Sequence, residues 1–121
     1  MRKVLVPVDG SEHSLHVAKF LIKQSGEFKM PLDVHLLNVQ HPLPGTIRGV
    51  AEQARQFHNE EGEKALDGTR KLFDAAKLQY SYHVVVGDAA SAIAQAVTEH
   101  QCDHVVMGTR GMGSVRNMLL G

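Results

Sequence analysis

The hydrophobic positions of this chain alternate between two spacings, one typical of buried strands and one typical of amphipathic helices. Nearly continuous runs of β-forming residues cover positions 3–8, 34–39, 80–86 and 102–107. Apolar runs of this length are typical of parallel strands buried on both faces. The segments between them have helical spacing. The helical positions are Leu15, Ala18, Leu21, Ile22 and Ser25, then Val50, Ala54, Phe57, Glu61, Ala65, Leu72, Phe73 and Ala76, then Ala90, Ile93, Ala94 and Val97.

Turn and capping signals separate these strands from these helices. Asp9-Gly10-Ser11 follows the first strand, and Ser11 is expected to cap a helix that ends near Gly26. Breaker residues fill positions 40–45, and Asp88 is expected to cap the third helix rather than bind a ligand. Strands that alternate with helices predict one α/β domain over residues 1–121. Its architecture would be a parallel sheet with helices on both faces, in three layers, α/β/α.

Composition and charge narrow the classes of function. The chain has 121 residues, of which 43% are hydrophobic, and 13 basic residues balance 13 acidic ones. This balance gives no electrostatic reason to expect nucleic acid or a membrane surface as partner. No apolar run approaches the roughly 18 residues of a membrane span. The single cysteine, Cys102, excludes an internal disulfide and favours the cytoplasm.

A glycine cluster directly after the fourth predicted strand carries the strongest functional signal. Gly108, Gly111 and Gly121 follow the pattern G-x-x-G-x₉-G. Glycine lets backbone amides approach a ligand closely, and successive amides at a strand-to-helix turn bind phosphate oxygens. Arg110 is a natural charged partner for a phosphate, and Ser114 either caps a last helix or offers its hydroxyl. The alternative is that the cluster is only a tight structural turn.

Asp9 is the candidate acid beside this phosphate site. Parallel sheets bind ligands outside the carboxyl ends of their strands, where the strand order reverses. If the first and fourth strands are neighbours, Asp9 faces the glycine loop. Mg²⁺ prefers one or two carboxylates together with phosphate oxygens, so Asp9 is the candidate metal ligand. The alternative is that Asp9 only caps the first helix through an Asx turn.

Three segments together resemble the universal stress protein family. They are Val-Pro-Val-Asp-Gly-Ser at 6–11, Val-Gly-Asp-Ala at 86–89 and Val-Met-Gly-Thr-Arg-Gly at 106–111. The glycine pattern resembles that of the family's ATP-binding branch. The resemblance implies a Rossmann-like, doubly wound parallel sheet of five strands, of the adenine nucleotide alpha hydrolase type. It also implies a homodimer, and ATP, ADP or AMP bound with Mg²⁺ or Mn²⁺. Family members continue beyond the equivalent of Gly121 into a fifth strand, so that strand is expected to be missing from this chain.

The resemblance also implies roles for single residues. Asp9, next to Pro7, would lie near the ribose or the metal, and Val39 would contact adenine. The segment from Met107 to Gly111 would line the ribose and phosphates, with Gly121 closing the site. The candidate nucleotide-binding residues are Pro7, Val8, Asp9, Val39, Met107, Gly108, Arg110, Gly111, Gly113, Ser114 and Gly121.

These residues favour an ATP-binding regulatory protein of the stress response, and two alternatives stay open. One is a slow ATPase or an adenylyl-transfer enzyme. It is disfavoured because the chain has no G-x-x-x-x-G-K-[ST] loop and no evident base to activate water. The other is an interaction protein of the same fold that binds no nucleotide. A dehydrogenase is disfavoured further, since the first strand-to-helix turn lacks G-x-G-x-x-G.

Eight histidines raise the question of a metal site. His13 and His16 are three apart in a predicted helix, and His100 and His104 are four apart across a predicted helix-to-strand turn. Neither pair has an evident third ligand nearby, so the sequence does not predict a structural zinc site. Cys102 is expected to pack, unreactive, at the start of a strand.

Overall fold

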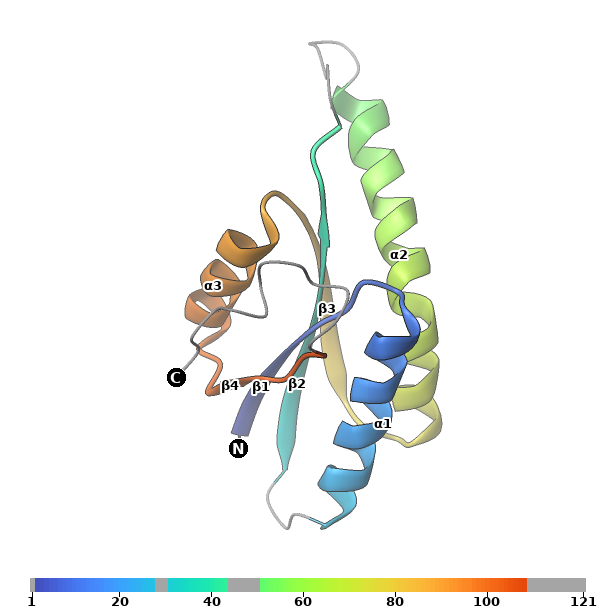
Figure 1. Ribbon diagram of the computed structural model, residues 1–121, viewed down its shortest axis with the longest axis vertical. Helices are drawn as coiled ribbons and strands as arrows, with labels where there is room; N and C mark the ends of the chain where they lie inside the picture. The colour runs from blue at the N-terminus through green and yellow to red at the C-terminus, as the bar shows by residue number, and fades with distance from the viewer. Residues whose placement is uncertain (1, 28–30, 44–50, 109–121) are drawn as a thin grey trace.

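The computed structural model describes residues 2–27, 31–43 and 51–108 (Figure 1). In this part of the chain, helices connect parallel strands. The elements are β1 (Arg2–Pro7), α1 (Glu12–Glu27), β2 (Leu32–Gln40), α2 (Ala51–Ala75), β3 (Tyr80–Val86), α3 (Ala89–His100) and β4 (His104–Val105). The predicted alternation of strands and helices is confirmed. The largest difference is in β4, where the two-residue strand replaces a predicted six-residue one.

The four described strands form one sheet in the order β3-β2-β1-β4, and all their pairings are parallel. Leu5 of β1 is in register with His35 of β2 on one side and with Val105 of β4 on the other. The chain moves outward from β1 to β3 and then crosses back to the far side of β1. The order therefore reverses between β1 and β4, which confirms that the first and fourth strands are neighbours.

Helices cover both faces of this sheet, as the three layers in Figure 1 show. On one face, Val6 and Leu36 pack with Leu66 and Phe73 of α2 and with buried residues of α1. On the other face, Leu5 and Leu37 pack with α3. Burial of each such side chain contributes about 1.5–3 kcal/mol, so both helix layers are held mainly by apolar contact. The predicted α/β/α architecture is confirmed.

Two predicted helix faces need correction. In α3 the buried residues are Ile93 and Ala96, whereas Ala94 is exposed. Ala94 lies about 100° around the helix from Ile93, at the border of the inner face. In α2, Phe57 is 45% exposed and His58 is buried in its place. Ala76 is exposed beyond the end of α2, and Val50 lies outside the described residues.

A close helix–sheet contact fixes α2 against β3. Gly62 of α2 is buried, and a Cβ atom at this position would lie 2.5 Å from both γ-methyl groups of Val84. Only a residue without a side chain permits this approach, because atoms cannot pack at that distance. Gly62 thus lets α2 lie directly on the edge of the sheet that β3 forms.

Candidate functional site

The carboxyl ends of β1, β2 and β4 lie side by side, and six of the predicted nucleotide-binding residues are found there. Three come from the end of β1 and two follow β4. The Val8 amide donates to the Leu37 carbonyl (2.8 Å) and the Val106 amide donates to the Leu5 carbonyl (3.0 Å), which aligns the three strand ends. The six residues are Pro7, Val8, Asp9, Val39, Met107 and Gly108. The other five, Arg110, Gly111, Gly113, Ser114 and Gly121, lie outside the described residues.

A network of hydrogen bonds holds the Asp9 turn at the start of α1. Asp9 Oδ1 accepts from the Ser11 amide (2.9 Å) and from the Ser14 hydroxyl (2.7 Å), while the Asp9 amide donates to Ser14 Oγ (3.1 Å). Ser11 Oγ in turn accepts from the Ser14 amide (3.3 Å), which confirms Ser11 as the cap of α1. Gly10 has φ +84°, and its Cβ position lies 3.1 Å from the Ala65 backbone, so the turn requires glycine.

This network makes Asp9 a stable carboxylate. Partial burial opposes ionisation of its side chain, but the hydrogen bonds from Ser11 and Ser14 outweigh that effect and lower the pKa of Asp9 below its ordinary value. The Asx-turn alternative is therefore real. It does not exclude ligand binding, because both hydrogen bonds go to Oδ1, and Oδ2 has no partner among the described residues.

Asp9 belongs to no group of three potential metal ligands within the described ranges. A metal ion at this position would therefore need oxygen ligands from elsewhere, and phosphate groups are the natural source for Mg²⁺. The geometry fits a cation shared between Asp9 Oδ2 and a ligand, rather than one held by protein side chains alone.

A buried polar chain beside Val8 was not predicted from the sequence. Asn38 is 3% exposed, donates to the Val8 carbonyl (2.8 Å) and accepts from Gln40 Nε2 (2.7 Å). Gln40 Oε1 lies 3.4 Å from Nδ1 of the buried His58 on α2. These hydrogen-bonded side chains link the ends of β1 and β2 to α2, and they orient the backbone on which Val39 lies. The sequence signal for it was an asparagine directly after two leucines in a predicted buried strand.

A hollow of about 380 Å³ lies between α1 and the segment that follows β4. It contains two of the predicted site residues, Met107 and Gly108, and two residues that sequence reasoning did not connect with the site, His13 and His16. A larger hollow of about 820 Å³, lined by Arg70, Asp74 and Tyr80 among others, contains none of the predicted residues. The smaller hollow is therefore the one that belongs to the predicted site.

Asp88 follows the carboxyl end of β3 and caps α3. Its side chain accepts a hydrogen bond from the Ser91 amide (3.0 Å), as the sequence predicted, and this bond lowers the pKa of the Asp88 carboxyl. Cys102 lies half-buried against the α3 face of the sheet, and burial, followed by the charge of Asp33, raises the pKa of its thiol. A protonated thiol is a weak nucleophile, which agrees with the predicted packing role.

Comparisons of the sequence with a family model and with single proteins point to the same family. The model of the universal stress protein family matches residues 1–121. A universal stress protein of Thermus aquaticus is 31% identical over 127 aligned positions, which cover 99% of this chain and 85% of that protein. In the part of the chain that the structure describes, no helix is both long and apolar enough to cross a membrane.

Solved structures share the fold. A universal stress family protein of Arabidopsis thaliana with AMP bound superimposes with a TM-score of 0.72 at 20% identity, covering 97% of this chain and 82% of that one. A universal stress protein in complex with cAMP gives a TM-score of 0.64 at 22% identity, covering 99% and 84%. At these identities the likeness shows the architecture alone.

Proposed function

The chain belongs to the universal stress protein family, and from this premise we propose that it is a regulatory protein of the stress response that binds adenine nucleotides at the carboxyl edge of its sheet. Two structural neighbours contain AMP and cAMP, which supports an adenine nucleotide as the ligand. The observation that carries the proposal is the adjacency of β1 and β4 at the point where the strand order reverses. Asp9 lies two residues after the end of β1, and Gly108 lies three residues after the end of β4.

In this proposal each residue has a separate task. Val39 contacts the adenine, while Pro7 and Val8 supply the floor below the ribose. Met107 and Gly108 begin the phosphate loop, and the sequence pattern continues it through Arg110, Gly111, Gly113, Ser114 and Gly121. ATP is the ligand that the glycine pattern favours, because several amides can then share the charge of the phosphates.

Asp9 would hold Mg²⁺ or Mn²⁺ through Oδ2 while Oδ1 stays bonded to Ser11 and Ser14. The ion would bridge the carboxylate to phosphate oxygens, because such ions prefer a few carboxylates together with the phosphates of the ligand. This division of the carboxylate explains how one side chain can cap α1 and bind a ligand together.

We favour regulation over catalysis. Asp9 and Asp88, the acids that follow β1 and β3, each accept hydrogen bonds that lower the pKa of their carboxyl groups. A carboxyl group with a low pKa is a poor general base near neutral pH. Slow ATP hydrolysis or adenylyl transfer remains the alternative function.

A homodimer whose surface reports nucleotide occupancy is also part of the proposal. Light scattering with and without AMP measures that dimer.

Isothermal titration of the purified chain with AMP, and with ATP in the presence of Mg²⁺, tests the proposal. We expect saturable binding of both, lost in Gly111→Val because the branched side chain blocks the amides. Gly26→Ala is the control, since a Cβ there meets no atom within 4 Å. Absence of binding by the folded wild-type protein would contradict the proposal.

Asp9→Asn separates the metal role from the capping role. Asparagine keeps an oxygen for Ser11 and Ser14 but loses the negative charge. Affinity for Mg²⁺–ATP should fall by about tenfold, equivalent to roughly 1.4 kcal/mol, while affinity for AMP without metal stays the same. An equal loss for both ligands would show that Asp9 acts on the turn and not on the ion.

A further inference from the structure

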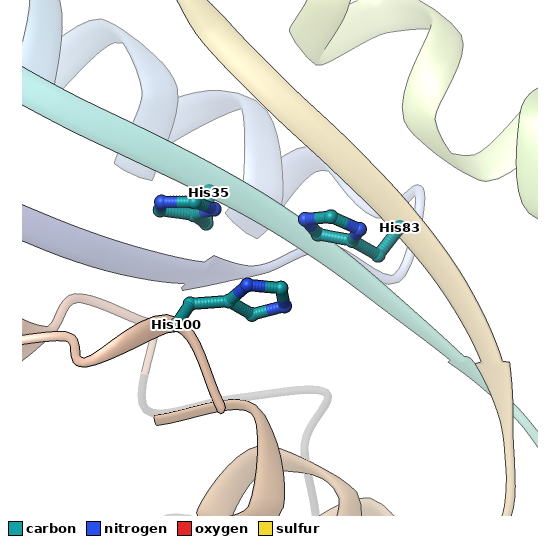
Figure 2. Close-up of side chains that lie close together, drawn as sticks. All are labelled: His35, His83 and His100. Carbon is teal, nitrogen blue, oxygen red and sulfur yellow. The ribbon is translucent and has the colours of Figure 1, made fainter. Parts of the chain in front are cut away.

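Three histidines from distant parts of the sequence meet on the α3 face of the sheet, on the side away from the strand ends described above. His35 comes from β2, His83 from β3 and His100 from the last turn of α3, as Figure 2 shows. The rings are stacked with centroid distances of 4.4–5.8 Å, and one nitrogen from each ring lies within 4.8 Å of the others. We call these residues the histidine triad.

The parallel register brings the triad together. His35 is paired with Ser81, so His83 lies two residues further along the neighbouring strand on the same face. The helix α3 runs back across this face and ends at His100. His83, the member of the triad nearest to the strand ends, is in register with Leu37, so it lies two residues, about 7 Å along the strand direction, before the level of Val39. The triad is therefore distinct from the proposed nucleotide site.

His83 has an unsatisfied polar atom. Its Nε2 is buried and has no hydrogen-bond partner among the described residues. A buried polar atom without a partner costs about 1–3 kcal/mol, so such atoms usually have a reason. Burial, followed by the proximity of His100 and His35, lowers the pKa of the His83 ring. Imidazole binds metals in its neutral form, which a lowered pKa favours.

His35 has outer-shell partners of the kind that metal-binding histidines use. Asp33 Oδ2 lies 3.4 Å from its Nε2, and Ser81 Oγ lies 2.9 Å from its Nδ1. A carboxylate beside one ring nitrogen fixes the tautomer and makes the other nitrogen a better ligand. The hydroxyl of Ser81 can rotate away from its present partner. Asp33 also adds a negative charge beside the triad.

We propose that His35, His83 and His100 form a binding site for a divalent transition metal ion, with Zn²⁺ as the ion that the ligands suit best and water in the fourth position. Three imidazole ligands favour Zn²⁺, Ni²⁺ or Cu²⁺ over Mg²⁺, which prefers oxygen. Zn–N bonds of about 2.0–2.1 Å place tetrahedral ligand nitrogens about 3.3 Å apart. The nitrogens lie within 4.8 Å of one another, so metal binding would require the stacked rings to turn about their side-chain torsions.

Titration of the chelator-treated full chain with ZnCl₂, without nucleotide, tests this site by calorimetry. We expect one ion per chain. His100→Ala should weaken binding by at least about tenfold, since loss of even an outer-shell partner costs that much. His100 is half-buried at a helix end, and circular dichroism verifies that the variant is folded. Asp33→Asn should weaken binding by about tenfold as well.

His16→Ala is the matched control, because His13 and His16 form another histidine pair with centroids 6.4 Å apart, outside the triad. This variant should bind Zn²⁺ with the wild-type affinity. Co²⁺ serves as a spectroscopic probe, and its visible absorption should indicate four-coordinate geometry in the wild type and disappear in His83→Gln. Absence of saturable binding, or wild-type affinity in both His100→Ala and His83→Gln, would overturn the proposal. Loss of binding in His16→Ala alone would overturn it too.

Discussion

Asp9 uses one carboxylate oxygen for the fold, and the other has no partner among the residues that the structure describes. Oδ1 accepts two hydrogen bonds at the start of α1, and these bonds lower the pKa of the group despite its partial burial. Folding therefore stabilises the ionised form. Because the pKa is lower in the folded state, this contribution is complete above the ordinary value of 3.8 and is lost as the pH falls through the folded-state pKa.

Ser14→Ala tests this coupling. The change removes the hydroxyl that donates to Asp9 Oδ1 and accepts from the Asp9 amide, so we expect the Asp9 pKa to rise. The free energy of unfolding at pH 7 should fall by about 1 kcal/mol, the usual net value of a hydrogen bond. Carboxyl chemical shifts in an NMR titration report the pKa, and urea denaturation at several pH values reports the stability.

The control for that experiment is Ser25→Ala in the same helix. Ser25 Oγ donates only to the Ile22 carbonyl (2.8 Å), away from the turn. Its loss should leave the Asp9 pKa unchanged. If both variants shift the pKa equally, the shift arises from α1 as a whole and not from the Ser14 hydroxyl.

Burial of single residues was predicted in part for apolar side chains and poorly for polar ones. In α2 the apolar pattern included the buried Phe73 but not the equally buried Leu66, and it gave no sign that His58 would be buried while Phe57 stays exposed. His58 is buried because Gln40 approaches its ring across the end of β2. Such a partner belongs to another element, so local periodicity contains no information about it.

At the scale of elements, the packing of α2 on β3 depends on the absence of a side chain at Gly62. A Cβ there would meet the γ-methyl groups of Val84 at 2.5 Å. Valine is stiff about its first side-chain torsion, so its methyl groups cannot easily move away. Relief would require the helix itself to shift from the strand.

Gly62→Ala should therefore destabilise the protein although alanine is the better helix former. Overpacking costs about 1–3 kcal/mol, and the helix propensity returns at most about 1 kcal/mol. We expect a net loss of about 1–2 kcal/mol in the free energy of unfolding, measured by urea denaturation.

Gly26→Ala is the counterpart in α1, where a Cβ would meet no atom within 4 Å. Only the propensity term remains, so the stability should rise by up to about 1 kcal/mol. Equal effects of the two changes would show that the contact between Gly62 and Val84 does not limit the packing.

The order and type of the elements followed from the sequence because each strand and helix has its own periodicity. Their ends followed less well. β2 begins at Leu32, before the predicted position 34, and α1 continues past Gly26 to Glu27. β4 was predicted from its apolar run, but only His104–Val105 pair with β1. Strand ends depend on the reach of the neighbouring strand, which the sequence of one segment does not contain.

At the scale of the whole molecule, the parallel sheet separates two sets of residues. The carboxyl ends of its strands bring Asp9, Val39 and Gly108 together, and this edge could be predicted because all parallel strands end on the same side. The triad lies further back, under the end of α3. It could not be predicted, because the contact of His35 with His83 and His100 depends on strand register and on the path of α3.

This separation gives a prediction for how two ligands together change the stability of the folded chain. A ligand that binds only the folded state raises the free energy of unfolding by about 2.7 kcal/mol when its concentration is a hundred times its dissociation constant. AMP and Zn²⁺ would act through different residues, of which the nearest, Val39 and His83, lie on neighbouring strands about 8 Å apart. Sites at such distances usually contribute additively, within about 0.5 kcal/mol. Together they should therefore raise the stability by about 5 kcal/mol, as measured by urea denaturation.

Two variants divide this sum into its parts. Gly111→Val should remove the contribution of AMP and retain that of Zn²⁺, whereas His100→Ala should do the reverse, because each change affects one site. If either variant removed both contributions, the ligands would share a site or the two sites would be coupled through β2, the strand that provides both Val39 and His35. If both ligands together raised the free energy of unfolding by clearly more than the sum of their separate effects, the sites would be positively coupled. Each ligand would then favour the state that the other binds.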